Sequence, residues 1–583
     1  MASLAVSDGP FNEQEFRSKI PNDISSTDRC FYEKLIPVLK NRKPSDKPRI
    51  VIITDIEQDY DDLMAIIFLS EMHRIGVVEL AGFIANHQQT LRRARFLRTI
   101  VYLLGLGHLE VALGTAGVEK IDGPQYARLT ASAYYELKNE TFDQMIWNTK
   151  PHRPGQRPDR SPEQILHDLK TQVDPPGASP FRSGRELMDD LAEQVDTEGK
   201  EPLTVLLISS MQDIAEYFDA HKNEDTFFKQ HFKKFVSQGG YYHVTAPDGT
   251  CTLEPNMDMN NNFVHKTAAK VYTDCLVKYD LPSDAWSREA AKAARLEGKT
   301  LGSLVEHGPI GTHLSWLYRR QEFKFYWDPY HAPYMPHLDP GWYATTRLCL
   351  DPHSEEYKKF TLTVPEFQEV VPYSKVIAYD GCAAMGAVGD DVMLALGVLR
   401  PADAVPAYNK PPQRHRIFGR GLDDQGKPDP TDLGGIDGPR LADVFQVFFY
   451  GALRATKDYA GKLIDPKAVR HRPVDRETLT PLHVFDRQTV YIRDVKAKKA
   501  DLKEKAAKVK VAGEGPEKKR LEEEVQALEA GIKECESAEL KALVNGVEKT
   551  FPRVPDPKQY PYPLLYERAV RHHEPPAWSA GES

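Results

Sequence analysis

The sequence has few cysteines and no long apolar run, and each absence excludes a class of protein. Only six cysteines occur among 583 residues, and no two of them form a CxxC pair. A zinc ribbon or a dense disulfide framework is therefore not expected, and a reducing compartment fits best. No stretch of about 18 consecutive apolar residues is present, so the sequence predicts no membrane-spanning helix.

Positive charge is not in excess. The chain has 76 Lys and Arg against 85 Asp and Glu, a formal net charge of -9. Phosphate backbones attract concentrated basic faces, so we expect neither nucleic acid nor a membrane as a partner. The first residues, MASLAVSDGPFNEQEF, have no long apolar core and carry acids early. They do not fit a secretory signal, and a cytoplasmic location is the default expectation.

What the sequence does contain is a regular alternation of apolar patterns from Arg49 onward. The runs RIVIITD, VVELAGFIAN, LEVALGTAG, LTVLLISS and FKKFVSQGG are typical of buried strands. Helical patterns such as DDLMAIIFLSEMHRI and TLRRARFLRTIVYLLG separate them. This alternation predicts a Rossmann-like α/β fold with an open, mostly parallel sheet flanked by helices.

Composition divides the chain into three parts. Residues 1–48 form a polar leader expected to pack on the next domain, and residues 49–483 form the α/β domain. Residues 484–583 form a helical hairpin and a Pro-rich tail. The segments 118–182 and 323–375 interrupt the strand and helix rhythm, and we expect them to be insertions.

The hairpin is expected from two apolar stripes in highly charged surroundings. The stripe positions, spaced three and four residues apart, are Ile492, Val495, Leu502, Ala506 and Val509, then Leu521, Val525, Leu528, Ile532 and Cys535. Glycines and a proline at 513–516 separate the two stripes. The charged faces are most simply solvated, although the hairpin at 490–548 could instead dock a protein partner or a second copy.

Five acids follow the first expected strand in the stretch VIITDIEQDYDDLMAI, residues 51–66. Ligands of open α/β sheets collect at the carboxyl ends of strands, where this stretch lies. Clustered carboxylates repel one another, whereas hard cations such as Ca²⁺ take several oxygen ligands. Asp61 and Asp62 alone would also suit a helix N-terminus. The full cluster favours a metal or catalytic site.

The stretch resembles the first motif of the inosine-uridine preferring nucleoside hydrolases, DxDxxxDD, which binds Ca²⁺ in that family. Here the motif runs from Asp55 to Asp62, with Glu57 at the second acid. Four later segments are similar to further family motifs in the same order. They are FIANHQQTLRRARFL with Asn86, LTVLLISSMQDIAEYF with Ile208, LEPNMDMNNNF with Glu254 and Asn256, and YDGCAAMGAV with Tyr379 and Asp380.

The resemblance implies Ca²⁺-assisted hydrolysis of the N-glycosidic bond of a ribonucleoside or related ribosyl compound. It implies four metal ligands, which are Glu57, Asp62, the carbonyl of Ile208 and Asp380. Glu57 would also be the base that activates water, and Asp55 would support the turn from behind. Four residues would contact the ribose: Asp61 at its 2′-hydroxyl, and Asn86, Glu254 and Asn256. Family members are commonly dimers or tetramers, so a homo-oligomer is a further expectation.

Two departures from the family pattern keep a second hypothesis open. Glu57 is one methylene longer than the usual Asp, and a shift approaching about 1 Å can cost about 100-fold in rate. Tyr379 stands where many members have His, and a phenol with a pKa of about 10 is a poorer proton donor. Tyr242, His243 or His331 could donate instead, although each could equally be structural.

The alternative function is therefore that of a catalytically impaired protein with the hydrolase fold, serving as a binding or structural subunit of a larger assembly. A third interpretation, a phosphatase of the haloacid dehalogenase type, also needs an Asp-x-Asp turn after the first strand. Asp55-Ile-Glu57 fits that turn poorly, and no companion Lys motif is evident.

Overall fold

The structure is a computed structural model, and part of the chain is described in it. The described residues are 11–56, 60–87, 90–115, 179–224, 226–245, 251–256, 260–261, 265–331, 339–365, 367–401, 403–406, 409, 413–419, 421–422, 428–429, 432–463, 499, 502–510 and 515–535. Glu57 and most of the expected insertion at 118–182 lie outside these residues.

A seven-stranded parallel sheet is the centre of the fold. Its strands are β1 (Arg49–Thr54), β2 (Glu79–Ala85), β3 (Val111–Leu113), β4 (Leu203–Ile208), β5 (Phe232–Gln238), β8 (Ser283–Trp286) and β11 (His415–Phe418). The order is β11-β8-β5-β4-β1-β2-β3, and every neighbouring pair is parallel. The predicted fold class is confirmed. Strands β1 and β4 are buried on both faces, which explains their continuous runs of Val, Ile and Leu.

The strand order reverses beside β1. The chain proceeds from β1 outward through β2 to β3, and then returns to the other side of β1 as β4. Thr54, the last residue of β1, lies in register with Ala85 of β2 and with Ile208 of β4. The carboxyl ends of three strands therefore meet at one level, at the kind of switch point where open α/β sheets bind ligands.

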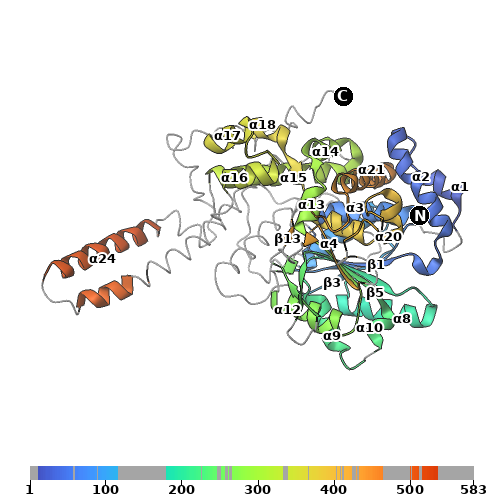
Figure 1. The fold of residues 1–583 in the computed structure, drawn as a ribbon, viewed down its shortest axis with the longest axis horizontal. Coiled ribbons are helices and arrows are strands. Elements are labelled where there is room, and N and C mark those ends of the chain that lie inside the picture. The colour runs from blue at the N-terminus through green and yellow to red at the C-terminus, as the bar shows by residue number, and fades with distance from the viewer. Residues whose placement is uncertain are drawn as a thin grey trace. The chain divides into compact units, whose positions relative to one another are not determined.

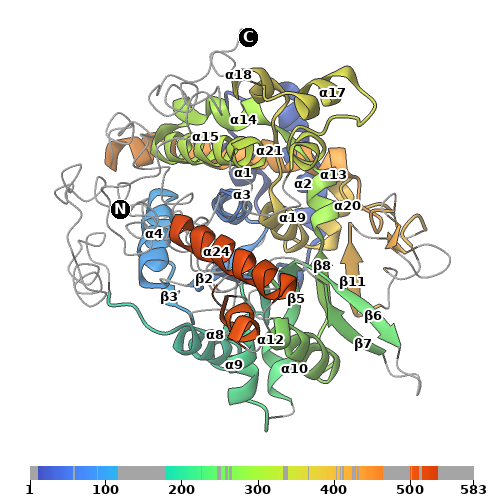
Figure 2. The same ribbon diagram turned by 90° about the vertical axis from the view of Figure 1, so that its left-hand side faces the viewer.

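Helices cover both faces of the sheet, as Figures 1 and 2 show. One face carries α3 (Asp61–Arg74), α4 (Thr90–Leu103) and α19 (Tyr379–Gly386), with α21 (Gly438–Leu463) packed behind them. The other carries α8 (Gly184–Glu198), α9 (Gln212–Ala220), α10 (Phe227–His231) and α12 (His265–Lys270). A continuous apolar core joins this second helical layer to Val51, Ile53, Val205 and Leu207 of the sheet.

The predicted leader contains two helices that pack on the sheet domain. These are α1 (Glu13–Lys19) and α2 (Ser26–Asn41), and α2 lies against α20 (Asp390–Leu396) and α21. Tyr32 donates its hydroxyl to the buried carboxylate of Glu71 at 2.7 Å. Arg42 forms a two-pronged pair with Asp391 at 2.6 and 2.7 Å. The leader is thus anchored by both apolar burial and ion pairing.

The remaining elements include an antiparallel hairpin that follows β5. It consists of β6 (Tyr241–Thr245) and β7 (Cys251–Pro255). The others are η1 (Pro44–Asp46), η3 (Val271–Val277), α13 (Arg288–Ala293), β9 (Leu296–Glu297), α14 (Gly298–Gly302), η4 (Ser303–His307), α15 (Gly308–His331), η6 (Val371–Tyr373), β10 (Lys375–Val376), β12 (Gly421–Leu422) and β13 (Pro428–Asp429).

The chain divides into two compact units. The first takes in residues 1–119, 139–319 and 373–471 and contains the sheet. The second takes in residues 120–138, 320–372 and 472–583. Its described helices beyond α15 include α16 (Pro340–Trp342), η5 (Tyr343–Arg347), α17 (Glu355–Leu362) and α18 (Phe367–Val370). Most of the expected insertion at 323–375 falls in this second unit.

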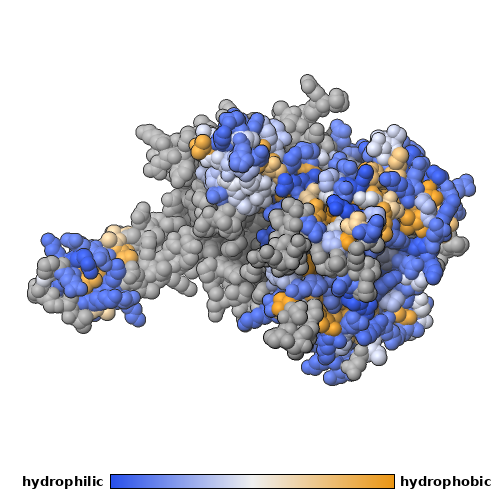
Figure 3. Space-filling view, viewed as in Figure 1, coloured by the Kyte–Doolittle hydropathy of each residue, from blue (hydrophilic) through white to orange (hydrophobic). Residues whose placement is uncertain are grey.

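The C-terminal helical hairpin is confirmed over its described residues, whereas the predicted stripe positions Ile492 and Val495 and the Pro-rich tail lie outside them. Residues 502–510 are helical, and α24 (Pro516–Cys535) follows after a short connection. Lys505 of the first helix pairs with Glu524 of the second at 2.7 Å, and Leu521 is buried. The face of the hairpin seen in Figure 3 is mostly hydrophilic, which suits the expected solvated surface. Among the described residues, no helix has both the length and the apolar character needed to cross a bilayer.

Candidate functional site

Three buried aspartates meet at the carboxyl end of β1. Asp61 and Asp62 begin α3, and Asp380 lies in the first turn of α19, more than 300 positions later. One carboxylate oxygen from each lies within 4.8 Å of the others. Their exposed fractions are 4%, 2% and 5%. The packing of α3 against α19 therefore brings together the acids of two separate sequence motifs.

Hydrogen bonds from strand and helix ends orient these aspartates. Thr54, the last residue of β1, donates its hydroxyl to Asp62 Oδ1. The same hydroxyl accepts the N–H of Ile56 at 3.1 Å, which closes the turn after the strand. Asp61 Oδ2 accepts the main-chain N–H of Tyr379 at 3.1 Å and that of Asp380 at 3.5 Å. Asp61 thus uses the otherwise unsatisfied amides at the start of α19.

A buried arginine braces the turn between β1 and α3. Arg93 of α4 is 1% exposed, and its Nη1 donates to the carbonyls of Asp55 and Ile56, the latter at 2.7 Å. Asp55 itself is buried. Sequence reasoning missed Arg93. The available signal was an arginine on the otherwise apolar stripe formed with Leu97 and Ile100.

Asn86, which follows β2, belongs to a polar network at the ends of β2, β3 and β4. Its Nδ2 donates to the carbonyl of Ser210 at 2.9 Å and to Asp213 Oδ2 at 2.8 Å. Its Oδ1 accepts the hydroxyl of Ser209. Asp213 also accepts the N–H and the hydroxyl of Thr115, at 2.8 and 2.9 Å. Burial raises the pKa of Asp213, and the hydrogen bonds from Asn86 and Thr115 oppose that rise.

A second polar cluster lies at the carboxyl end of β5. Asn256 is buried, and its N–H donates to the carbonyl of Gly240 at 2.9 Å. Asn261 donates from Nδ2 to that carbonyl at 2.7 Å and to Asn256 Oδ1 at 2.9 Å. Tyr272 in turn donates to Asn261 Oδ1 at 2.9 Å. Glu254 is exposed on β7, where it lies opposite Tyr242 of β6. Asn256 is therefore held rigidly, and Glu254 is open to solvent.

The remaining predicted residues have varied positions. Ile208 ends β4 in register with Thr54, so its main chain lies at the same edge of the sheet as the aspartates. Tyr379 is half-buried at the first position of α19. Burial lowers the pKa of His243 in β6. His331 ends α15 in the second unit. Glu57 lies outside the described residues.

The neighbouring cysteine is poorly suited to nucleophilic chemistry. Cys382 lies two residues after Asp380 and is buried. Burial raises the pKa of the Cys382 thiol, and the negative charge of Asp61 adds to the effect. A thiol that resists ionisation is a weak nucleophile and a weak metal ligand.

The three aspartates fit a hard divalent cation. Three buried carboxylates this close together repel one another, and a bound cation removes that repulsion. Calcium takes oxygen ligands at about 2.3–2.6 Å, so oxygens that share one ion lie a few ångströms apart. The spread of 4.8 Å among the aspartate oxygens is compatible with that arrangement. The donor set, oxygen without a described thiol or imidazole, favours calcium or magnesium over zinc.

No family model matches the sequence, and no curated protein matches it. Solved structures do match. The type III effector protein XopQ, in a complex with adenosine diphosphate ribose, has a TM-score of 0.50 and 15% identity, and the match covers 74% of this chain and 99% of that one. A plant nucleoside hydrolase, PpNRh1, has a TM-score of 0.35 and 15% identity, covering 69% and 98%.

The inosine-uridine preferring nucleoside hydrolase from Bacillus anthracis has a TM-score of 0.33 and 14% identity, covering 70% of this chain and 99% of that one. At 15% identity the likeness to XopQ concerns the fold alone. It is a likeness over almost the whole of the effector, and it agrees with the parallel sheet and flanking helices described above.

Proposed function

We propose that this protein hydrolyses the N-glycosidic bond of a ribonucleoside or a related ribosyl compound, and that it does so with a bound Ca²⁺. The observation that carries the proposal is the meeting of Asp61, Asp62 and Asp380 at the carboxyl end of β1. Their position at the switch point of the sheet is where a ligand of this fold class binds. The likeness to XopQ, whose structure holds adenosine diphosphate ribose, supports a ribosyl ligand.

The proposed cation ligands are Asp62, Asp380, Glu57 and the carbonyl of Ile208. A bound Ca²⁺ would polarise sugar hydroxyls and acidify a water molecule. The hydroxyl of Thr54 holds the Asp62 carboxylate in one orientation. Preorganised ligands of this kind bind without reorganising, so more of the binding free energy is realised.

The chain's own groups would then perform the substrate contacts. Asp61 is held by the amides of Tyr379 and Asp380, so its carboxylate is fixed for a hydrogen bond to the ribose 2′-hydroxyl. Glu57 would take the proton of the attacking water, and Tyr379 would assist the departing base. Asn256, locked by Asn261, would contact the sugar. Glu254, exposed on β7, would contact the sugar as well.

The test is release of ribose by the full chain. The purified protein is incubated with Ca²⁺ and a panel of purine and pyrimidine ribonucleosides and adenosine diphosphate ribose, and free ribosyl product is measured. We expect release from at least one compound, loss of release with a chelator, and a loss of at least about 100-fold in Asp380→Asn. Asp219→Asn, an exposed aspartate of α9 paired with Lys270, is the matched control and should keep full activity.

Calorimetry of Ca²⁺ and ligand binding, together with the release assay, separates the two functional hypotheses. Ca²⁺ binding with ribosyl release supports the enzyme. If Ca²⁺ and a ribosyl compound both bind but no compound in the panel is cleaved, hydrolysis is excluded and the impaired binding protein remains. If no Ca²⁺ binds, the proposed function is wrong in both forms.

A further inference from the structure

The carboxylate of Asp213 connects three strand ends at the switch point of the sheet. It accepts Asn86 Nδ2, from the residue that follows β2, at 2.8 Å. It accepts both the N–H and the hydroxyl of Thr115, which lies just beyond β3, at 2.8 and 2.9 Å. Asp213 itself lies in the first turn of α9, after β4. One buried side chain therefore joins the segments that follow β2, β3 and β4.

The carboxylate also fixes the direction of every hydrogen bond in this network. An ionised carboxylate only accepts, so the amide group of Asn86 must present its nitrogen to Asp213. The second hydrogen of that nitrogen then donates to the carbonyl of Ser210 at 2.9 Å. The amide oxygen is turned the other way, where it accepts the hydroxyl of Ser209. The acceptor character of Asp213, together with that of the Ser210 carbonyl, thus selects one of the two orientations of the Asn86 amide.

Asn86 in that orientation ties β1 to β4 beside the aspartates. Its main-chain N–H donates to the carbonyl of Thr54 at 2.9 Å, and its side chain bonds both Ser209 and Ser210. Thr54 is the residue whose hydroxyl holds Asp62. Ser209 directly follows Ile208, whose carbonyl is a proposed cation ligand. Asn86 therefore connects Thr54, which is bonded to Asp62, with Ser209, which follows Ile208. Asp62 and Ile208 are proposed ligands of the same ion.

The main chain at Gly114 packs closely against both side chains. A Cβ atom added at Gly114 would lie 2.6 Å from Asn86 Cβ and 2.8 Å from Asp213 Oδ1. The backbone of Gly114 is itself bonded to the end of β2, through its N–H and the carbonyl of Ala85 at 2.8 Å. The two side chains are thus confined by the main chain that passes over them. Packing this close makes the network rigid rather than adaptable.

The orientation of Asn86 also limits what it can offer a ligand. An amide has two N–H donors and two acceptor lone pairs. Both donors are directed to the protein, and one lone pair accepts Ser209. At most one lone pair of Oδ1 is left for a sugar hydroxyl. Asn86 is therefore better suited to holding the site together than to gripping ribose.

We propose that Asp213 is a positioning residue, which sets the Asn86 amide and thereby fixes the spacing between the Thr54–Asp62 side and the Ile208 side of the cation site. The inference rests on the proposed function in one respect, the binding of a divalent cation at the aspartates. It does not depend on the reaction, because the spacing of the ligands acts on metal affinity directly. Residues that orient ligands from behind typically change metal affinity by about 10–100-fold.

Asp213→Asn is the central variant, because it keeps the size of the side chain and adds a donor. The new amide can still accept Thr115 N–H with its oxygen, but its nitrogen then faces Asn86 Nδ2. Two N–H groups cannot bond each other, so in this orientation the Asn86 amide turns over or moves. Turning over would place its oxygen against the carbonyl oxygen of Ser210. The opposite orientation of the new amide keeps the bond to Asn86 but sets its nitrogen against the N–H of Thr115. We expect the Ca²⁺ affinity of the full chain, measured by calorimetry with the ion alone, to fall by about 10–100-fold.

Thr115→Val is the matched control on the same carboxylate. It removes one hydrogen bond to Asp213 but leaves the bond to Asn86 in place. If the network only stabilises the fold, both variants should have lower melting temperatures. Their Ca²⁺ affinities should then be either both unchanged or both reduced. Positioning predicts lower melting temperatures in both, with the affinity loss confined to Asp213→Asn. Ser209→Ala, which frees the amide oxygen of Asn86, should lower the affinity by a smaller factor and serves if Asp213→Asn does not fold.

Three results would overturn the proposal. The first is that Asp213→Asn binds Ca²⁺ as tightly as the natural chain does. The second is that Thr115→Val loses as much Ca²⁺ affinity as Asp213→Asn, and the third is that the natural chain does not bind Ca²⁺. A natural chain that binds Ca²⁺ but releases no ribosyl product is a different outcome. It would contradict the proposed reaction and leave the positioning role supported or refuted by the affinities alone.

Discussion

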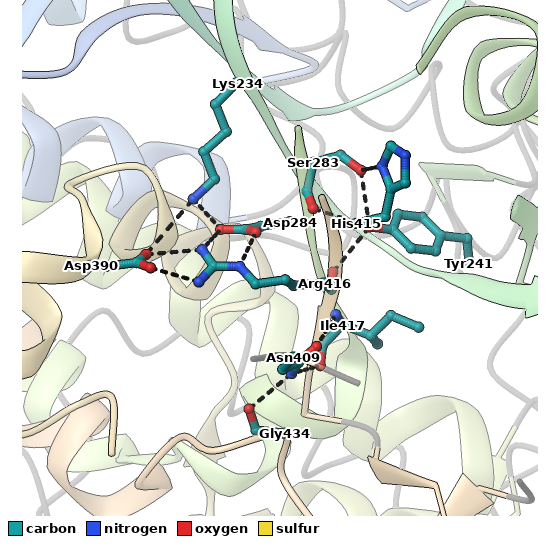
Figure 4. A network of polar contacts seen from close by, with 10 residues as sticks. All are labelled: Lys234, Tyr241, Ser283, Asp284, Asp390, Asn409, His415, Arg416, Ile417 and Gly434. Atoms are coloured by element: carbon teal, nitrogen blue, oxygen red, sulfur yellow. Dashed lines mark hydrogen bonds and ion pairs between the residues drawn. The ribbon is translucent and has the colours of Figure 1, made fainter. Parts of the chain in front are cut away.

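Arg416 of β11 and Asp284 of β8 form a two-pronged ion pair inside the sheet domain, with both nitrogen to oxygen distances at 2.7 Å (Figure 4). The same guanidinium bonds both oxygens of Asp390 at the start of α20, at 2.6 and 2.9 Å. Lys234 of β5 approaches the two carboxylates as well. Burial alone would lower the pKa of Arg416, but attraction to Asp284 and Asp390 outweighs it and raises that pKa.

Arg416→Met should therefore be strongly destabilising. It leaves two carboxylates to share Lys234, and Asp284 is 1% exposed. Removing one partner of a buried ion pair typically costs about 3–5 kcal/mol, and we expect a loss of about 3 kcal/mol because Lys234 remains. Arg414→Met is the matched control. Arg414 and Asp280 pair with each other, and their side chains are 51% and 56% exposed. The control should lose less than about 1 kcal/mol in chemical denaturation. Equal losses would contradict the argument.

The strands and the acidic site were accessible from the sequence because each has a local signature. Buried parallel strands read as continuous apolar runs, which is how β1 and β4 could be placed. Asp61 and Asp62 stand out because charge is rare between a buried strand and a buried helix. Asp380 was reached through its motif, and the structure brings it to the other two.

The residues that hold the site in place could not be predicted from the sequence, because their roles depend on contacts between distant segments. Nothing near Asp213 in the sequence distinguishes it from any acid in the first turn of a helix, where acids are common. Its importance arises when Asn86 and Thr115, about 100 positions earlier, reach it in the fold. The orientation of the Asn86 amide is likewise set by its neighbours in space, so the predicted ribose contact of Asn86 stays a prediction.

Two helical glycines should respond oppositely to alanine. A Cβ added at Gly386 of α19 would lie 2.0 Å from Trp286 Nε1, and that indole is fully buried against Phe418. Gly386→Ala should cost about 1–3 kcal/mol by overpacking. A Cβ at Gly461 of α21 would meet nothing within 4 Å. Gly461→Ala should stabilise the protein by about 0.5–1 kcal/mol, because alanine favours the helix. Thermal unfolding of the two variants checks both signs, and destabilisation by Gly461→Ala would be the contrary result.

The buried imidazole of His73 leads us to expect that the protein loses stability on acidification. It is 4% exposed in the last turn of α3, and its Nδ1 accepts the N–H of Leu80 at 3.0 Å. Burial, with smaller effects of nearby positive groups, lowers its pKa to about 3. The unfolded chain takes up this proton near pH 6.5 while the folded chain does not. Stability should therefore fall as pH decreases from about 6.5 to about 3, by up to about 1.4 kcal/mol per pH unit.

His73→Gln tests this slope, because glutamine can accept from Leu80 N–H without titrating. The variant should be less sensitive to pH between about 6.5 and 3, whatever its stability at neutral pH. His353→Gln, at an exposed position, should keep the slope of the natural chain. Denaturant unfolding at a series of pH values gives the comparison. An unchanged slope in His73→Gln would mean that other groups dominate acid unfolding.

Arg93 should control the geometry of the acidic turn. Its buried guanidinium donates to the carbonyls of Asp55 and Ile56, which adjoin the aspartates. Arg93→Met leaves these carbonyls without that donor, so the turn can shift relative to Asp62. We expect Ca²⁺ affinity to fall by about 10–100-fold. Arg93→Lys should recover only part of the affinity, because the ammonium of a lysine is a point charge on a flexible stem and lacks the fixed donor geometry of the guanidinium.

Arg98→Met is the control on the same helix, because Arg98 packs over the ring of Phe181 at 3.4 Å. It should lower the melting temperature while leaving Ca²⁺ affinity within about twofold, since it removes a half-buried cation–π contact with Phe181. Calorimetric titration of the three variants at one salt concentration separates the two effects. If Arg93→Met and Arg98→Met lose affinity equally, the effect comes from α4 as a whole, and the specific brace on Asp55 and Ile56 is excluded.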